Sequence, residues 1–211
     1  MLVTGEYRFQ RRLMRYSPSP DYIDTFYLGE MTRGDALSLY RYFRGEEPRE
    51  EEKVVVEQGV GGHPGLLKEI ASKWGLSYVC RYVRRVQQIV VEHRLSLAED
   101  GEALAEELEE MLEKLAEKPL ARTARRVEVL DELVERGVLQ YGCSVYLGIY
   151  EWNRDCGGDA GGVEGLECGG GGWCGGLDVV APANRLMRIG LLLAVDRRPE
   201  IPEPVRRLCR V

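Results

Sequence analysis

The stretch Gly61-Gly62-His63-Pro64-Gly65-Leu66-Leu67 decides how the middle of this chain is interpreted. The two leading glycines allow backbone angles and close approaches that a Cβ atom would prevent. Pro64 suits the first turn of a helix, where its missing N–H costs nothing. Apolar residues then recur at helical spacing up to Gly75. This pattern predicts a short helix that begins at Pro64 and ends at Gly75.

The glycine turn, defined here as residues 61–65, can have either of two roles. The simpler role is a tight connection in which His63 caps the following helix or packs against it, and the residues alone favour this role. The other role is a binding site, because the unpaired N–H groups at a helix N-terminus attract an anion or a flat base.

The segments before the turn favour a binding role. Residues 1–5 are predicted to form a buried strand that ends at Thr4-Gly5, and residues 24–28 are predicted to form a second strand. Amphipathic and acidic helices are predicted over 36–43 and 50–57. A basic amphipathic helix is predicted over 7–16, between the two strands, so the chain reads as strand, helix, strand, two helices and then the glycine turn.

This order resembles the C-terminal half of the archaeal P-loop ATPases of the STAND/AAA+ group. The matching segments are Thr4-Gly5-Glu6, Tyr27–Thr32 with Asp35-Ala36, and Gly61–Gly65. The resemblance implies that the first segment is the sensor-1 strand end and the second opens a helical lid. It also implies a turn over the adenine base, with the nucleotide-binding residues Thr4, Gly62, His63 and Pro64.

The sequence departs from this family in its catalytic motifs. It contains no G-x-x-x-x-G-K-[ST] motif to hold the phosphates and no apolar strand ending in paired acids to hold Mg²⁺. ATP or ADP is therefore expected to bind only together with another polypeptide that carries the P-loop, or with a subunit of the same family. We assign no catalytic residue and do not expect ATP hydrolysis by this chain alone.

The second half of the chain resembles the winged-helix domain that follows the lid in many of these ATPases. Helices are predicted over 78–93, 103–117 and 120–135, and β-rich runs follow at 138–141, 145–152 and 177–180. An arginine-rich first half, as in the 120–135 helix, is typical of a helix that enters a DNA groove. The candidate DNA-binding residues are Arg122, Arg125 and Arg126. A protein-contact role for this domain is the alternative.

A glycine-dense loop over 153–176 is predicted as an extended wing tip. Four cysteines lie in or near it, without the C-x₂₋₄-C pairs of a structural zinc site. Zinc is accordingly disfavoured, and free thiols are favoured over a disulfide among them. These residues are Cys143, Cys156, Cys168 and Cys174.

Composition limits the class of protein. A net charge of −6 over 211 residues argues against general nucleic-acid coating. Abundant Glu and Arg with only two asparagines are typical of hyperthermophile proteins. No secretory signal is visible, and the apolar run 189–195 is far shorter than the roughly 20 residues that span a bilayer. This run is predicted to lie in a last helix, over 185–195, that packs back on the core. We expect a cytoplasmic protein with no membrane partner.

These inferences predict a mostly α protein with a small β component. Residues 1–30 are predicted as a remnant of an ATPase core, 31–95 as a helical lid, 96–198 as a winged-helix-like domain and 199–211 as an extended tail. The predicted function is nucleotide or partner binding and regulation, as the non-hydrolytic C-terminal part of an ATP-dependent switch. The alternative is a stand-alone winged-helix protein that binds double-stranded DNA and regulates transcription.

A self-sufficient enzyme is the least favoured possibility. The two histidines, His63 and His93, lie far apart in the sequence, and no G-x-S-x-G, H-E-x-x-H or Cys-His signature accompanies them.

Overall fold

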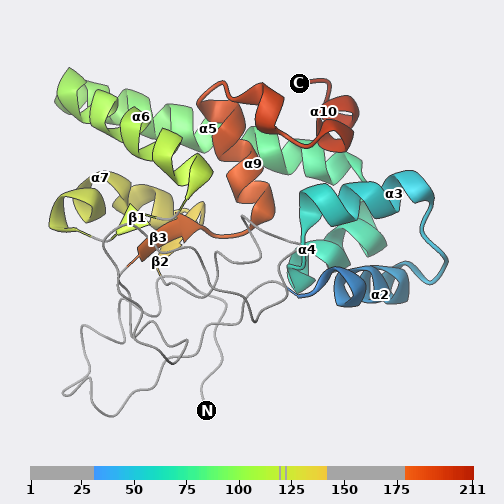
Figure 1. Ribbon diagram of the computed structural model, residues 1–211. Coiled ribbons are helices and arrows are strands. Elements are labelled where there is room, and N and C mark those ends of the chain that lie inside the picture. The colour runs from blue at the N-terminus through green and yellow to red at the C-terminus, as the bar shows by residue number, and fades with distance from the viewer. Residues whose placement is uncertain (1–30, 119, 122, 142–178) are drawn as a thin grey trace, which may run out of the picture.

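The structure is a computed structural model that describes residues 31–118, 120–121, 123–141 and 179–211 (Figure 1). Within these ranges the chain is mostly helical with one small sheet, which confirms the predicted fold class. The predicted strands 1–5 and 24–28, the β-rich run 145–152 and the wing loop 153–176 lie outside the described residues. So do several candidate site residues, namely Thr4, Arg122, Cys143, Cys156, Cys168 and Cys174.

The first group of helices surrounds the glycine turn. It comprises α2 (Arg33–Arg44), α3 (Glu50–Val55), the π-helical turn η2 (Val56–Val60), α4 (Pro64–Glu69) and the π-helical turn η3 (Ile70–Trp74). Gly45 ends α2 at φ 77° and Gly75 follows η3 at φ 61°, left-handed angles that glycine adopts without a Cβ penalty. The predicted helices over 36–43, 50–57 and 64–74 are confirmed in their positions.

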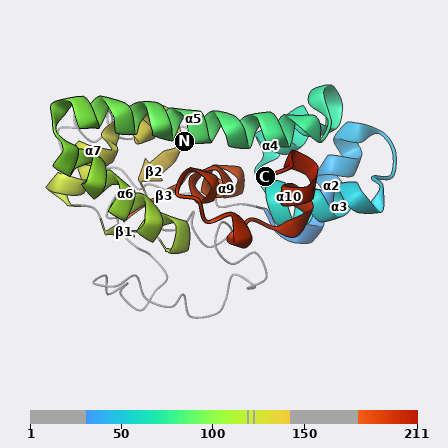
Figure 2. The same cartoon turned by 90° about the horizontal axis from the view of Figure 1, so that it is seen from above.

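Helix α5 (Ser77–Asp100) is longer than predicted and crosses residues 95 and 96, where we expected the lid to end. Val79, Val83, Val86 and Val90 form its buried stripe. Figure 2 shows α5 running along one side of the molecule, past both groups of helices. The two halves of the protein therefore share one continuous helix.

The second group contains α6 (Glu102–Glu117), α7 (Ala124–Glu135) and the sheet. Strands β1 (Leu120–Ala121), β2 (Leu139–Tyr141) and β3 (Val179–Pro182) are antiparallel in the order β1-β3-β2. Leu120 and Tyr141 both lie opposite Val180. The prediction of a helix from residue 120 was wrong at its start. Leu120 pairs with β3, and α7 begins only after Thr123, whose side chain accepts the Arg126 N–H.

Helix α9 (Arg185–Ala194) packs back on the core, as the sequence predicts, and contributes to two apolar clusters. Leu186, Ile189 and Leu192 join the cluster of the first group, whereas Leu191 joins the cluster of α5, α6, α7 and the sheet. Gly190 lies where α9 meets α5, because a Cβ atom there would be 2.4 Å from the Val86 Cβ. The close crossing of α5 and α9 thus joins the two halves.

The extended tail that we predicted over 199–211 was wrong. After a 3₁₀ turn, η4 (Arg198–Glu200), the chain forms α10 (Glu203–Cys209). Ile201, Val205 and Cys209 are buried. Their i, i+4, i+8 spacing gives a helix one apolar stripe, and prolines at positions 202 and 204 are compatible with a first helical turn.

None of the helices in the described part of the chain is both long enough and apolar enough to cross a membrane.

Candidate functional site

The glycine turn connects η2 to α4 and packs against the chain that leads into α2. The Gly61 N–H donates to the Val56 carbonyl at 3.0 Å, and Gly61 has φ 75°. The Gly62 carbonyl accepts the Met31 N–H at 3.1 Å. A Cβ atom on Gly62 would lie 2.3 Å from both the nitrogen and the oxygen of Met31. Glycine is therefore required at 62 by backbone-to-backbone packing.

His63 is the N-cap of α4. Its Nδ1 accepts the Leu66 N–H at 3.3 Å, and Pro64 occupies the first turn. Burial lowers the pKa of His63 below its usual value. Because an accepting Nδ1 requires a neutral ring, the geometry assigns the proton to Nε2. The helix-capping role of His63 is confirmed.

A carboxylate and a tyrosine lie at the other end of this helical segment. The Tyr78 hydroxyl of α5 donates to the Glu69 Oε2 at 2.7 Å. Burial, together with this hydrogen bond and the negative charge of Glu69, raises the pKa of Tyr78 to about 12. The phenol therefore stays protonated at neutral pH and ties α4 to α5.

The predicted nucleotide-binding residues Gly62, His63 and Pro64 share one turn in the structure. Gly62 is buried and contacts Met31, His63 is partly exposed, and Pro64 and Gly65 are exposed. Any ligand at this turn would thus meet the outer edge formed by residues 63–65. Sequence patterns did not reveal the role of Met31, because its contact with Gly62 is between backbone atoms.

The candidate DNA-binding residues of α7 are engaged with carboxylates. Arg125 Nε donates to both carboxylate oxygens of Glu107, and its Nη1 donates to Glu128 at 3.0 Å. Arg126 is partly buried and contributes to the lowered pKa of Glu110, which has Lys114 as its main cause. The acidic face of α6 thus neutralises Arg125, which would have to exchange these partners for DNA phosphates.

A second feature that sequence reasoning missed is a disulfide between Cys80 in α5 and Cys209 in α10. These cysteines lie 129 residues apart, and no local pattern links them. Among the residues that the structure describes, no group of three or more His, Cys, Asp or Glu side chains is arranged to hold a metal ion.

A scan of this chain against protein-family models gave no match, and neither did searches of the curated proteins and of the solved structures.

Replacing Gly62 with alanine should lower the free energy of unfolding by about 2 kcal/mol, because the new Cβ atom overlaps the Met31 backbone. Denaturant unfolding followed by far-UV circular dichroism measures the change. The matched control is Gly34→Ala in α2, where a Cβ atom would meet nothing within 4 Å. That control should be neutral or stabilising by up to about 1 kcal/mol. Equal effects of the two substitutions would contradict the packing described for the turn.

Replacing His63 with alanine should cost about 1 kcal/mol near neutral pH through loss of the helix cap, whereas His63→Asn should retain most of the stability. Because burial depresses the pKa of folded His63, its contribution is present above the unfolded value of 6.5 and is lost as pH falls through the folded value. The stability advantage of the wild type over His63→Ala should therefore shrink below pH 6.5. An advantage that stayed constant down to about pH 4, past the usual histidine range, would contradict this assignment.

Proposed function

We propose that this chain is the lid and winged-helix-like part of an ATP-dependent switch, which contributes to a nucleotide site completed by a P-loop polypeptide. In this proposal, Gly62, His63 and Pro64 form the turn that faces the adenine base. The chain contributes to nucleotide binding and to regulation of the switch, and the partner supplies the phosphate-binding loop and the Mg²⁺ ligands. Thr4 is proposed as the sensor-1 residue.

The observation that carries the proposal is the hydrogen bond from the Met31 N–H to the Gly62 carbonyl. Met31 belongs to the segment that resembles the opening of the family's lid, so two of the matching segments meet at Met31 and Gly62. Two further features support the proposal. His63 accepts the Leu66 N–H and so caps the first turn of α4. Pro64 and Gly65, beside it, are exposed at the surface. Helix α5 runs without a break from the lid helices to α6, the helix that precedes the sheet.

Photolabelling with 2-azido-ATP tests the position of the adenine. The full chain is irradiated with the probe and Mg²⁺, alone and together with a separately supplied P-loop ATPase polypeptide, and is then digested with trypsin. Label should appear on the peptide Val54–Lys68, only in the mixture, and should disappear with excess ATP. The Gly62→Ala variant should label more weakly because its turn is displaced from Met31.

Two results would count against the proposal. If neither the chain nor the mixture is labelled, the nucleotide role is lost. If label appears in the mixture only on the P-loop polypeptide, the two chains bind each other but the glycine turn does not contact the base.

The small sheet favours a second candidate function. Strands β2 and β3 form an antiparallel pair that follows α7, and β1 precedes that helix. This is the pattern that suggested a winged-helix DNA-binding protein, with α7 as the helix that contacts DNA. The ion pairs of Arg125 with Glu107 and Glu128 make this candidate the weaker one.

Fluorescence anisotropy with a duplex DNA, titrated over a range of salt concentrations, tests this second function. If Arg125 contacts a phosphate, Arg125→Ala should reduce the slope of log K against log salt by about one. Arg207→Ala is the control, because this exposed arginine lies on α10 and pairs with Glu203. The absence of salt-sensitive binding, or an equal effect of both variants, would exclude DNA contact through α7.

A further inference from the structure

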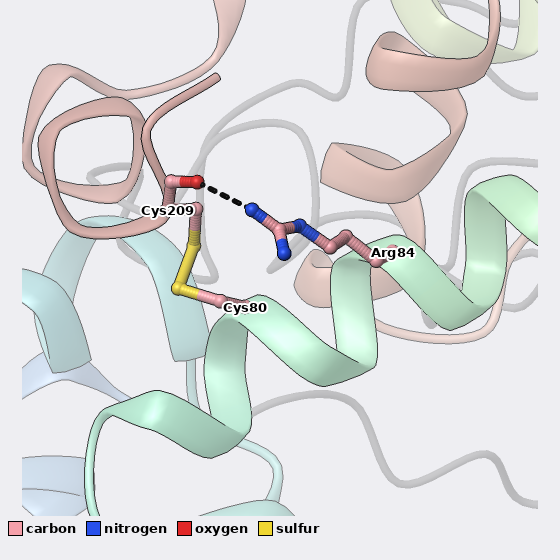
Figure 3. The surroundings of a disulfide bond; sticks show 3 residues. All are labelled: Cys80, Arg84 and Cys209. Atoms are coloured by element: carbon pink, nitrogen blue, oxygen red, sulfur yellow. Dashed lines mark hydrogen bonds between the residues drawn. A yellow bond between two sulfur atoms is a disulfide. The ribbon is translucent and has the colours of Figure 1, made fainter.

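The disulfide joins the C-terminal helix to the long central helix. Cys80 lies near the start of α5, and Cys209 is the last residue of α10. Arg84, one turn after Cys80, donates from Nη2 to the Cys209 carbonyl oxygen at 3.0 Å (Figure 3). The end of α10 is thus held by one covalent bond and by a hydrogen bond from the same helix.

Helix α10 covers the segment that leads into the glycine turn. It packs against α3, η2 and α5. Val205 is fully buried and packs against Gly59 in η2. A Cβ atom added to Gly59 would lie 2.5 Å from the Val205 Cγ2. Because η2 ends directly before Gly61, the packing of α10 on η2 helps to hold the glycine turn in place.

A helix as short as α10 is not stable by itself and stays folded only while it is docked. The disulfide keeps it next to its docking surface at a high effective concentration. Without the bond, the same apolar contacts remain available, but the segment can leave and return.

We propose that the Cys80–Cys209 disulfide is a thiol-controlled latch that keeps α10 docked over η2. A dithiol reductant, such as a protein with a Cys-x-x-Cys site, would open it. Reduction lets α10 undock reversibly, exposes the apolar surface around Gly59 and loosens the segment that supports the glycine turn. This inference does not depend on nucleotide binding.

The exchange reaction has a defined direction. Cys80 is partly exposed and Cys209 is buried, so the thiolate of the dithiol attacks the Cys80 Sγ and forms a mixed disulfide. The Cys209 Sγ leaves as a thiolate, on the residue whose carbonyl oxygen accepts the hydrogen bond from the Arg84 guanidinium, and then takes a proton from water. The second thiol of the reductant displaces the Cys80 Sγ, which is also protonated. The protein gains two electrons and two protons, and the reductant becomes a disulfide.

Hydrogen–deuterium exchange on the full chain tests the latch, with dithiothreitol as the dithiol. The variant to use carries serine at positions 143, 156, 168 and 174, so that Cys80 and Cys209 are its only cysteines. On reduction, the amides of residues 56–61 should exchange about tenfold faster or more, because opening becomes frequent. Trypsin should then also cleave after Arg206 and Arg207 faster, while far-UV circular dichroism keeps most of its helical signal.

A second variant, with alanine at both Cys80 and Cys209, provides the matched control. It should show the fast exchange without dithiothreitol and no response to it. Unchanged exchange of residues 56–61 on reduction would overturn the latch. Global loss of helical signal on reduction would also overturn it, since the whole chain would then unfold without the bond and α10 would not undock from a folded protein. The four-serine variant alone decides the question if the alanine variant does not fold.

Discussion

Replacing both Cys80 and Cys209 with alanine should lower the free energy of unfolding by about 4–5 kcal/mol under non-oxidising denaturation, the largest effect we expect from any change in this chain. The disulfide spans 129 residues, so in the unfolded state it closes a loop of more than half the protein. Restricting so long a loop removes much of the entropy that unfolding would gain. Guanidinium unfolding followed by circular dichroism measures the difference.

The single variant Cys80→Ala provides the matched control, because one substitution already removes the bond. It should be destabilised nearly as much as the double variant, and dithiothreitol should not destabilise either further. The free energy of unfolding of the wild-type protein in dithiothreitol should approach that of both variants. A loss below about 1 kcal/mol in the double variant would contradict a cross-link between α5 and α10, since it falls outside the typical range for a disulfide.

Replacing Gly190 with alanine should lower the free energy of unfolding by about 3 kcal/mol. The added Cβ atom would lie 2.4 Å from the Val86 Cβ and 3.2 Å from the Val83 carbonyl oxygen. The backbone fixes the position of any Cβ atom, and the Val83 carbonyl oxygen belongs to the backbone too, so helices α5 and α9 must separate. Both apolar clusters include residues of these helices, so the separation weakens both halves of the protein.

Thermal and guanidinium unfolding measure this effect, and Gly34→Ala is again the matched control because it adds the same methyl group to an open helical position. A second substitution, Val86→Gly, tests the contact itself, because it removes both the Cβ and the Cγ1 atoms that the new methyl group would meet at 2.4 and 2.5 Å. Val86→Gly combined with Gly190→Ala should cost less than the sum of the two single changes, because the added methyl group then has room. Strict additivity would contradict a direct clash between these positions.

The contact of α10 with Gly59 and the glycine turn both lie at the C-terminal end of η2. If both proposals hold, the thiol state of α10 changes how firmly the turn is held, and therefore how well it meets a nucleotide. Exchange at residues 56–61 reports the latch, and 2-azido-ATP labelling of Val54–Lys68 reports the site. The two experiments fail independently of one another.

Much of the helical structure followed from local signals in the sequence. Gly45 and Gly75 end their helical segments because the left-handed angles they adopt are costly for residues with a Cβ atom. Apolar spacing placed α2, α6 and α9 within a few residues. The cap at His63, directly before Pro64, was also expected from the sequence, because a capping side chain bonds to a backbone N–H only three residues away.

Contacts between distant segments decided the rest. Leu120 became part of a strand because β3 offers it backbone partners, and residues 203–209 became helical because α3, η2 and α5 cover their apolar side. The Glu107 partner of Arg125 also lies on another element, so an arginine-rich helix half did not mean a free basic surface. Likewise, the approach of Met31 to Gly62 and the Cys80–Cys209 bond depend on packing between segments far apart in the chain. Such pairings leave no local pattern, because their free energy is gained only when the whole chain has folded.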